Sequence, residues 1–196
     1  MHPALAKNLY LVKEHVGVFK AANNFDIFDP DTGEEILHCR EDRLGTLTRM
    51  LRFTDYKVYT PFDVELRTPS GEPILTVERG VSLFLSKVRV SDAAGTLLGG
   101  FQQKFFSIGG KFDVLDPSDA PLCTLRGKWT GWDFRFEAGS QELARVSKKW
   151  SGIGKEMFTS ADNYMLSINE EVPAESRLRG LILAAVLCID MVLKER

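Results

Sequence analysis

The chain has 196 residues, of which 44% are hydrophobic and 27% charged, and both shares are ordinary for a soluble globular protein. Its formal net charge is -2, so no overall basic field attracts nucleic acid, and we expect no nucleic-acid partner. The three cysteines, Cys39, Cys123 and Cys188, lack the paired spacing of a disulfide framework or a zinc site, which favours a reducing, cytoplasmic location. No long apolar segment opens the chain and no linker divides it, so residues 1–196 are predicted to form a single domain.

One pattern recurs along most of the chain. An alternating apolar stretch runs into a polar turn and returns as a second alternating stretch, which is typical of a β-hairpin. In the first copy, Pro30 presets its backbone angle and Gly33 supplies a positive φ where the chain reverses. The copies occupy residues 25–37, 64–77, 88–98, 112–122 and 134–143.

The period of two also predicts which face of each strand is buried. Glycines inside these strands suit places where another element approaches closely or where a strand bends at a barrel corner, as expected for Gly99, Gly100 and Gly127. The predicted inward faces are Leu97, Gly99, Phe101 and Phe105; Cys123, Leu125, Gly127 and Trp129; and Ala144, Val146 and Trp150.

Two segments change to a helical period. Leucines spaced by three and four residues predict a short helix between Asp42 and Phe53. In the last segment, Leu181 to Leu193 is apolar on every side apart from Asp190, which is typical of a membrane span or a buried core helix. A span needs roughly 17–25 apolar residues, so we expect a core helix enclosed by a β-barrel, with Gly180, Ala184 and Ala185 allowing the strands to approach it.

The end of the chain carries a recognisable set of motifs. Trp150-Ser-Gly precedes the pair Asp162-Asn163, and the terminal apolar helix contains Ile189-Asp190. This arrangement resembles the phospholipid scramblase family, and the Phe-Asp-Val-x-Asp-Pro type of hairpin resembles the LURP-one-related proteins, which share the Tubby C-terminal fold. The resemblance implies a mainly β protein, a closed antiparallel barrel of about twelve strands around a buried hydrophobic C-terminal helix.

No chemistry-bearing motif stands on this scaffold. The segment from Asp162 to Glu170 lacks the alternating oxygen ligands of an EF-hand, and His2, His15 and His38 lack metal-ligand spacing, so no metal site is predicted. The serines lack a nucleophile elbow and the glycine pairs lack a phosphate-loop pattern. We therefore predict no catalytic residue, no cofactor and no enzymatic activity.

The outward face of the strands carries the best functional lead. If the aromatic face is inside, cations on successive strands point outward and would form a basic stripe on neighbouring strands. Such a stripe attracts anionic headgroups at about 1 kcal/mol per cation, and the Tubby resemblance implies phosphoinositide binding. The alternative is that these cations only solubilise the sheet, diluted by Glu78, Glu137 and Glu142. The candidate residues for binding lipid or phosphate are Lys87, Arg89, Lys104, Arg126, Lys128, Arg145 and Lys149.

These features predict a non-enzymatic binding module of the scramblase and LURP-one type, cytoplasmic and peripheral to membranes of anionic lipid. Two alternatives remain open: a scramblase that acts in the bilayer through its C-terminal helix, and a small-molecule-binding protein or enzyme with a pocket at one barrel end. The hairpins could also offer edge strands to a protein partner of unknown identity.

Overall fold

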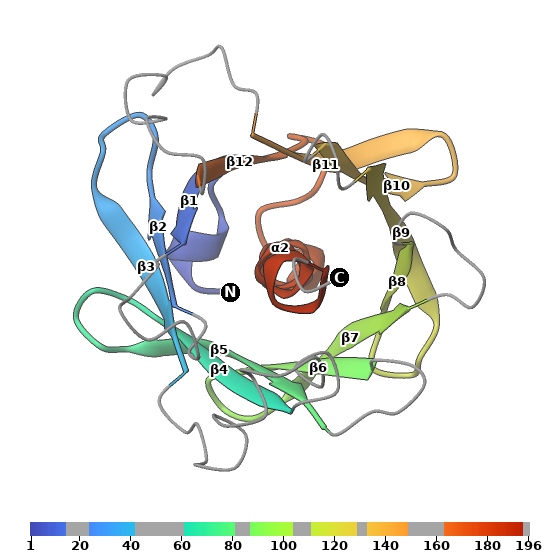
Figure 1. Cartoon of the computed structure of the whole chain (residues 1–196), viewed down its shortest axis with the longest axis horizontal. Coiled ribbons are helices and arrows are strands. Elements are labelled where there is room, and N and C mark those ends of the chain that lie inside the picture. Colours follow the sequence, from blue (N-terminus) through green and yellow to red (C-terminus); the bar gives the residue numbers. More distant parts are fainter. Residues whose placement is uncertain are drawn as a thin grey trace.

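The computed structural model shows a closed barrel of antiparallel strands with a single long helix along its axis (Figure 1). It describes residues 1–14, 24–41, 61–80, 87–103, 111–128, 133–148 and 163–193. Neighbouring strands follow the chain order, and β12 closes the ring by pairing with β1. The strands are β1 (Leu9–Glu14), β2 (Phe25–Phe28), β3 (Glu35–Arg40), β4 (Phe62–Arg67), β5 (Pro73–Arg79), β6 (Lys87–Asp92), β7 (Leu97–Gln103), β8 (Phe112–Leu115), β9 (Pro121–Lys128), β10 (Asp133–Ala138), β11 (Gln141–Ser147) and β12 (Asn163–Ile168).

A short 3-10 helix, η1 (Pro3–Leu5), precedes β1, and the axial helix is α2 (Arg177–Leu193). The predicted closed antiparallel barrel around a buried C-terminal helix is thus confirmed. The ring leaves no unpaired edge among its twelve strands, so the expectation that hairpin edges are offered to a partner is wrong. The helix predicted between Asp42 and Phe53 lies outside the described residues.

All five predicted hairpins are present, and their turns share one backbone feature. Each turn contains a residue in the left-handed region, which a side chain normally disfavours. Four of these positions are glycines and the fourth hairpin uses Asp119 at a φ of 66°, because a short polar side chain tolerates this conformation. All five turns lie at the same end of the barrel as η1 and the start of α2, and we call this the turn end. The glycines are Gly33, Gly71, Gly95 and Gly139.

Where the structure describes them, the predicted inward faces are confirmed with one correction, whereas Phe105, Trp129 and Trp150 lie outside the described residues. Phe101, Leu125 and Val146 are all buried in the core. Leu97 was expected to join them, but the register shifts between Val90 and Ser91, and Leu98 packs against the core instead. The cause is Gly99, whose φ of 148° interrupts the alternation of faces.

As predicted, glycines inside the strands lie where a neighbouring strand or the helix comes close to the backbone. A Cβ added to Gly99 would lie 2.1 Å from the carbonyl oxygen of Leu115 and 3.2 Å from Cδ1 of Leu181 on α2. A Cβ at Gly127 would lie 2.2 Å from Cδ1 of Phe134 on the paired strand. The strands can therefore curve tightly around the helix only because these positions carry no side chain.

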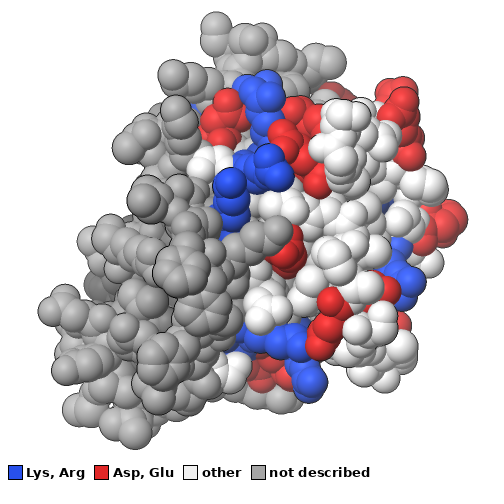
Figure 2. Space-filling view, turned by 90° about the vertical axis from the view of Figure 1, so that its right-hand side faces the viewer, with Lys and Arg blue, Asp and Glu red and all other residues white. Residues whose placement is uncertain are grey.

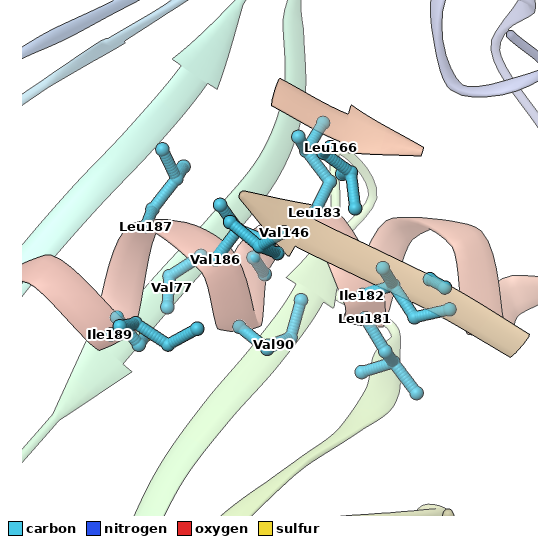
Figure 3. Close-up of a cluster of buried hydrophobic side chains, with 14 of the residues drawn as sticks. Val77, Val90, Val146, Leu166, Leu181, Ile182, Leu183, Val186, Leu187 and Ile189 are labelled. Carbon is cyan, nitrogen blue, oxygen red and sulfur yellow. The ribbon is translucent and has the colours of Figure 1, made fainter. Parts of the chain in front are cut away.

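The core of the molecule is the interface between α2 and the inner wall of the barrel. Every residue from 181 to 189 is buried, and Figure 3 shows the side chains of α2 projecting all around the helix toward strand residues such as Val77, Val90, Val146 and Leu166. Burying one Leu, Ile or Val contributes about 1.5–3 kcal/mol, and this segment buries six. Their sum, roughly 10 kcal/mol or more, is comparable with the whole net stability of a typical domain.

A buried arginine fixes the start of α2. The side chain of Arg179 is embedded at the turn end with 3% of the residue exposed. Its guanidinium donates to the carbonyl oxygens of Val172 at 2.7 Å and Lys7 at 2.8 Å, and to Oδ1 of Asn8 at 2.8 Å. Further bonds reach the carbonyl oxygens of Ala6 and Pro173. Every N–H of the guanidinium has an acceptor, so the cation ties the helix to the segment that leads into β1.

The opposite end of the barrel has its own buried cation. Arg79, the last residue of β5, is 4% exposed and its Cζ lies 4.7 Å from the centre of the Phe62 ring. Burial raises the pKa of the Cys188 thiol on α2 to about 12, and the charge of Arg79 opposes that rise only in part. Burial, followed by the charge of Asp113, likewise raises the pKa of Cys123 to about 12.

The need for glycine at the left-handed turn position can be tested by comparing Gly71 with Gly80. A Cβ would meet nothing within 4 Å at Gly71 or at Gly80, but Gly71 has a φ of 90°. We expect Gly71→Ala to lower the free energy of unfolding by about 1 kcal/mol, since Ala is strained at positive φ. Gly80→Ala should leave it unchanged or raise it slightly in urea denaturation, and equal effects of the two variants would contradict this assignment.

Removing the Arg179 guanidinium should be strongly destabilising. Arg179→Met leaves several buried carbonyl oxygens without donors, so the free energy of unfolding should fall by about 3 kcal/mol or more. The matched control is Arg177→Met, because Arg177 lies in the same helical turn and is exposed; we expect a change within about 0.5 kcal/mol. Similar losses for both variants in urea melts would argue against a structural role for the buried cation.

The buried thiols should be inert in the native state. A rise of the pKa from 9.0 to about 12 for Cys123 and Cys188 reduces their thiolate fraction at pH 8 by about a thousandfold. Cys39 is fully buried as well. We expect Ellman's reagent to react with the described thiols only after urea unfolds the protein. Rapid reaction of a thiol in the native protein would refute this.

Candidate functional site

The predicted outward cations fall into two separate groups on the barrel wall. Arg126 lies on β9 and Arg145 on β11, whereas Lys87 and Arg89 lie on β6, with β7 and β8 between the groups. Neighbouring strands are about 4.8 Å apart, so β6 and β9 are separated by roughly 14 Å. Figure 2 shows basic side chains in the upper part of this face, near its lower edge and at its right, with acidic side chains among them. Lys104, Lys149 and the side chain of Lys128 lie outside the described part of the chain.

The first group is larger than the sequence suggested. Arg126, Arg135 and Arg145 are directly opposite one another across β9, β10 and β11, and we call them the arginine row. Arg135 was not among the predicted candidates. Its position between the inward-facing Phe134 and Phe136 is the signal that could have found it.

Like charges placed directly opposite on a sheet repel each other, so the row needs compensation. Each arginine is paired with one carboxylate. Arg126 Nε lies 3.6 Å from Glu137 Oε2, and Arg135 Nη1 lies 3.5 Å from Glu142 Oε2. Arg145 forms a bidentate pair with Asp133, with Nε and Nη2 donating at 2.9 and 2.8 Å.

These pairs are exposed and differ in strength. The arginine side chains are 56%, 46% and 42% exposed in chain order, and exposed pairs are worth about 0–1 kcal/mol each. Asp133, first by its hydrogen bonds and then by its charge, raises the pKa of Arg145. The row is therefore a mixed array of positive and negative charges.

The second group has acidic neighbours as well. Lys87 Nζ lies 2.6 Å from Asp119 Oδ2 at the turn of the next hairpin. Arg89 lies opposite Glu78 on β5 and opposite Gly100 on β7. The second group thus contributes two cations, each near a carboxylate-bearing position.

The turn end of the barrel is rich in carboxylates. Its described cations include Lys7, paired with Asp29, the exposed Arg177 and the buried Arg179. The amino group of Met1 lies 3.7 Å from Glu175, and Lys87 of β6 reaches Asp119. The pKa of Asp116 is lowered, mainly by its hydrogen bond with Ser118, as is that of Asp29, mainly by its hydrogen bond with Lys7. The acidic residues of the turns and of the segment before α2 are Asp29, Asp31, Glu34, Glu72, Asp92, Asp116, Asp119, Glu170, Glu171 and Glu175.

A groove of about 420 Å³ lies beside the arginine row, on the outside of β11, β12 and β1 near the turn end. Arg145 belongs both to the row and to the wall of this groove. Ser167 is opposite Arg145 on β12, and Leu9 is opposite Ser167 on β1. The groove is therefore a lateral continuation of the arginine row.

The interior offers much less space. Between α2 and strands β6 to β9 there is an apolar gap of only about 10 Å³, lined by side chains such as Phe101, Ala185 and Cys188. That is room for about one water-sized probe. Among the described residues there is no group of three or more His, Cys, Asp or Glu side chains placed to hold a metal ion. Of the segment from Asp162 to Glu170, which lacks an EF-hand pattern, Asp162 lies outside the described residues, and the rest forms β12 and the turn after it.

Within the described residues, no helix combines the length and the apolar character needed to cross a bilayer.

Comparison with known proteins identifies relatives of low identity. Human phospholipid scramblase 2 is 22% identical over 151 residues, covering 69% of this chain and 50% of the relative. The Saccharomyces cerevisiae protein named altered inheritance rate of mitochondria protein 25 is 25% identical over 185 residues, covering 78% and 54%. The chain thus spans about half the length of the curated relatives it matches.

An X-ray structure of an Arabidopsis thaliana protein shares the fold, with a TM-score of 0.56 at 16% identity over 97% of this chain and 96% of the other. A family model described as Scramblase matches residues 10–196. With nearly the whole chain matched, and with the expected barrel and helix in place, the chain belongs to the scramblase family.

Proposed function

We propose that this chain is a non-enzymatic module that binds the headgroups of anionic phospholipids peripherally, from the cytoplasm, through the outer wall of the barrel. The observation that carries the proposal is the arginine row, three arginines in direct register across β9, β10 and β11. Family membership supports a lipid ligand, since several relatives are named phospholipid scramblases.

The energetics of the row favour exchange of its partners. Arg126 and Arg135 hold their carboxylates at 3.6 and 3.5 Å, with about half of each arginine side chain exposed. Little is lost when such a pair opens. A phosphate offers a guanidinium two oxygens at once, and a charged membrane contributes about 1 kcal/mol for each cation near it. Lipid phosphates can therefore displace these carboxylates.

The distribution of charge suggests the orientation of binding. The turn end carries carboxylates that an anionic surface repels, so the side wall with the arginine row is the better contact. Carboxylates within the row limit its affinity, and we expect binding to be weak and sensitive to salt.

The binding module is favoured over a bilayer-inserted scramblase by the position of α2. Inserting this helix would expose the inner wall of the barrel and break the Arg179 contacts to Val172, Lys7 and Asn8. A small-molecule protein with an internal pocket is less favoured, because the gap beside α2 is only about 10 Å³.

Co-sedimentation with vesicles tests the proposal. We expect the protein to bind vesicles of equal parts phosphatidylserine and phosphatidylcholine at low salt, and phosphatidylcholine alone much more weakly. Arg135→Gln should weaken binding about fivefold, as expected for about 1 kcal/mol per cation.

Arg67→Gln is the matched control, because Arg67 is also a partly exposed strand arginine with a carboxylate partner, Glu65, but lies on β4. It should change the affinity by less than about twofold. Absence of binding to the anionic vesicles, or binding that salt does not weaken, would overturn the proposal.

A further inference from the structure

The groove beside the arginine row contains opposite charges at its two ends. Arg145 provides the cation, on the side toward the middle of the barrel wall. Glu142 and Glu170 provide carboxylates nearer the turn end. Its volume of about 420 Å³ is within the range of small-molecule sites. The groove is thus large enough for a polar headgroup and is not uniformly basic.

The charged side chains of the groove keep hydrogen-bonding positions that no described residue occupies. Asp133 occupies Nε and Nη2 of Arg145, while Nη1 has no hydrogen bond within the described residues. Glu170 is exposed and makes no side-chain hydrogen bond or ion pair there. Glu142 lies 3.5 Å from Arg135, and its charge also helps to raise the pKa of Arg145. The groove therefore offers both a cation that can bind a phosphate, on Arg145, and a carboxylate that can bind an ammonium group, on Glu170.

Neutral polar side chains complete the groove and are held in place. Oδ1 of Asn8 accepts from Arg179 at 2.8 Å, which couples this wall to the buried helix start. Nδ2 of Asn169 donates to the carbonyl oxygen of Glu142 at 3.2 Å. Ser167 also lines the groove, and its hydroxyl donates to the carbonyl oxygen of Arg145 in a long bond of 3.5 Å. Side chains fixed in this way lose little freedom when a ligand binds.

We propose that this groove binds the phosphate ester of a primary amino alcohol, such as ethanolamine phosphate. The phosphate is bound by Arg145 and the hydroxyl of Ser167, and the ammonium group lies toward Glu142 and Glu170. A phosphate without an ammonium group meets uncompensated repulsion from the two carboxylates. The lipid form of this ligand rests on the function proposed above, whereas the free ester does not.

The test is a titration of the full chain followed by the NMR shifts of its backbone amides. The probes are glycerophosphoethanolamine, O-phosphoethanolamine, glycerol 3-phosphate and ethanolamine. We expect the two esters that carry an ammonium group to shift the amides of residues 144–145 and 167–170, and to bind at least about tenfold tighter than glycerol 3-phosphate or ethanolamine. Tighter binding of the diester identifies the lipid headgroup as the source, and tighter binding of the monoester identifies the free compound.

Two glutamates of the turn end make a matched pair of variants. Glu170→Gln removes a carboxylate of the groove and should weaken binding of the better ester about three- to tenfold. The ratio between the affinities for this ester and for glycerol 3-phosphate should therefore become smaller. Glu175→Gln removes an exposed carboxylate outside the groove and should change neither the affinity for the ester nor the preference for it over glycerol 3-phosphate.

Equal binding of glycerol 3-phosphate, no response to any ester, or tighter ester binding by Glu170→Gln would overturn the inference. The vesicle experiment separates this failure from failure of the proposed function. Glu170→Gln should bind anionic vesicles at least as well as the unaltered chain, because it removes a negative charge and leaves the arginine row intact.

Discussion

The enclosure of α2 is the constraint on which the rest of this structure depends. A helix that is apolar on every side needs a surrounding wall, and twelve strands provide it by closing into a ring. The ring in turn needs positions without side chains, such as Gly99, where the strands approach each other and the helix. Arg179 then fixes the helix axially through carbonyl oxygens of the segments before β1 and before α2. Helix, wall and clamp are interdependent, so loss of any one of them weakens the other two.

Because α2 occupies the inside of the barrel, we place ligand recognition on its outer surface. In the described part of the chain, the gap beside α2 is only about 10 Å³, so the surfaces described for recognition are the turns and the outward side chains of the strands. The turns are acidic, whereas β9, β10 and β11 present three arginines in register. The groove over β11, β12 and β1 shares Arg145 with that row and Asn8 with the helix clamp. The recognition surface is thus built on paired strands and on a residue bonded to the helix clamp, and a binding site on such a scaffold loses little entropy.

The sequence predicted the architecture well, because hairpins and an all-apolar helix are local patterns. Each of the five hairpins has its turn residue and alternation within about a dozen residues, and the core helix follows from Leu181 to Leu193 alone. Leu97 was placed wrongly because the bulge at Gly99 depends on the neighbouring strand. The clamp of Arg179 joins residues more than 160 positions apart, and the pairing of Arg126 with Glu137 depends on strand register. Neither can be read from local sequence, which is why the cations looked more available than they are.

The central claim is that α2 stays inside the barrel while the outer wall contacts lipid. Spin labels at Glu72→Cys on the barrel and Arg177→Cys at the helix start test it, because both positions are exposed and the described native thiols are buried. Electron spin resonance then measures the distance between the labels in solution and on anionic vesicles. The account predicts the same distance distribution in both states. A new, longer distance that appears only on vesicles would mean that the helix leaves the barrel and would contradict it.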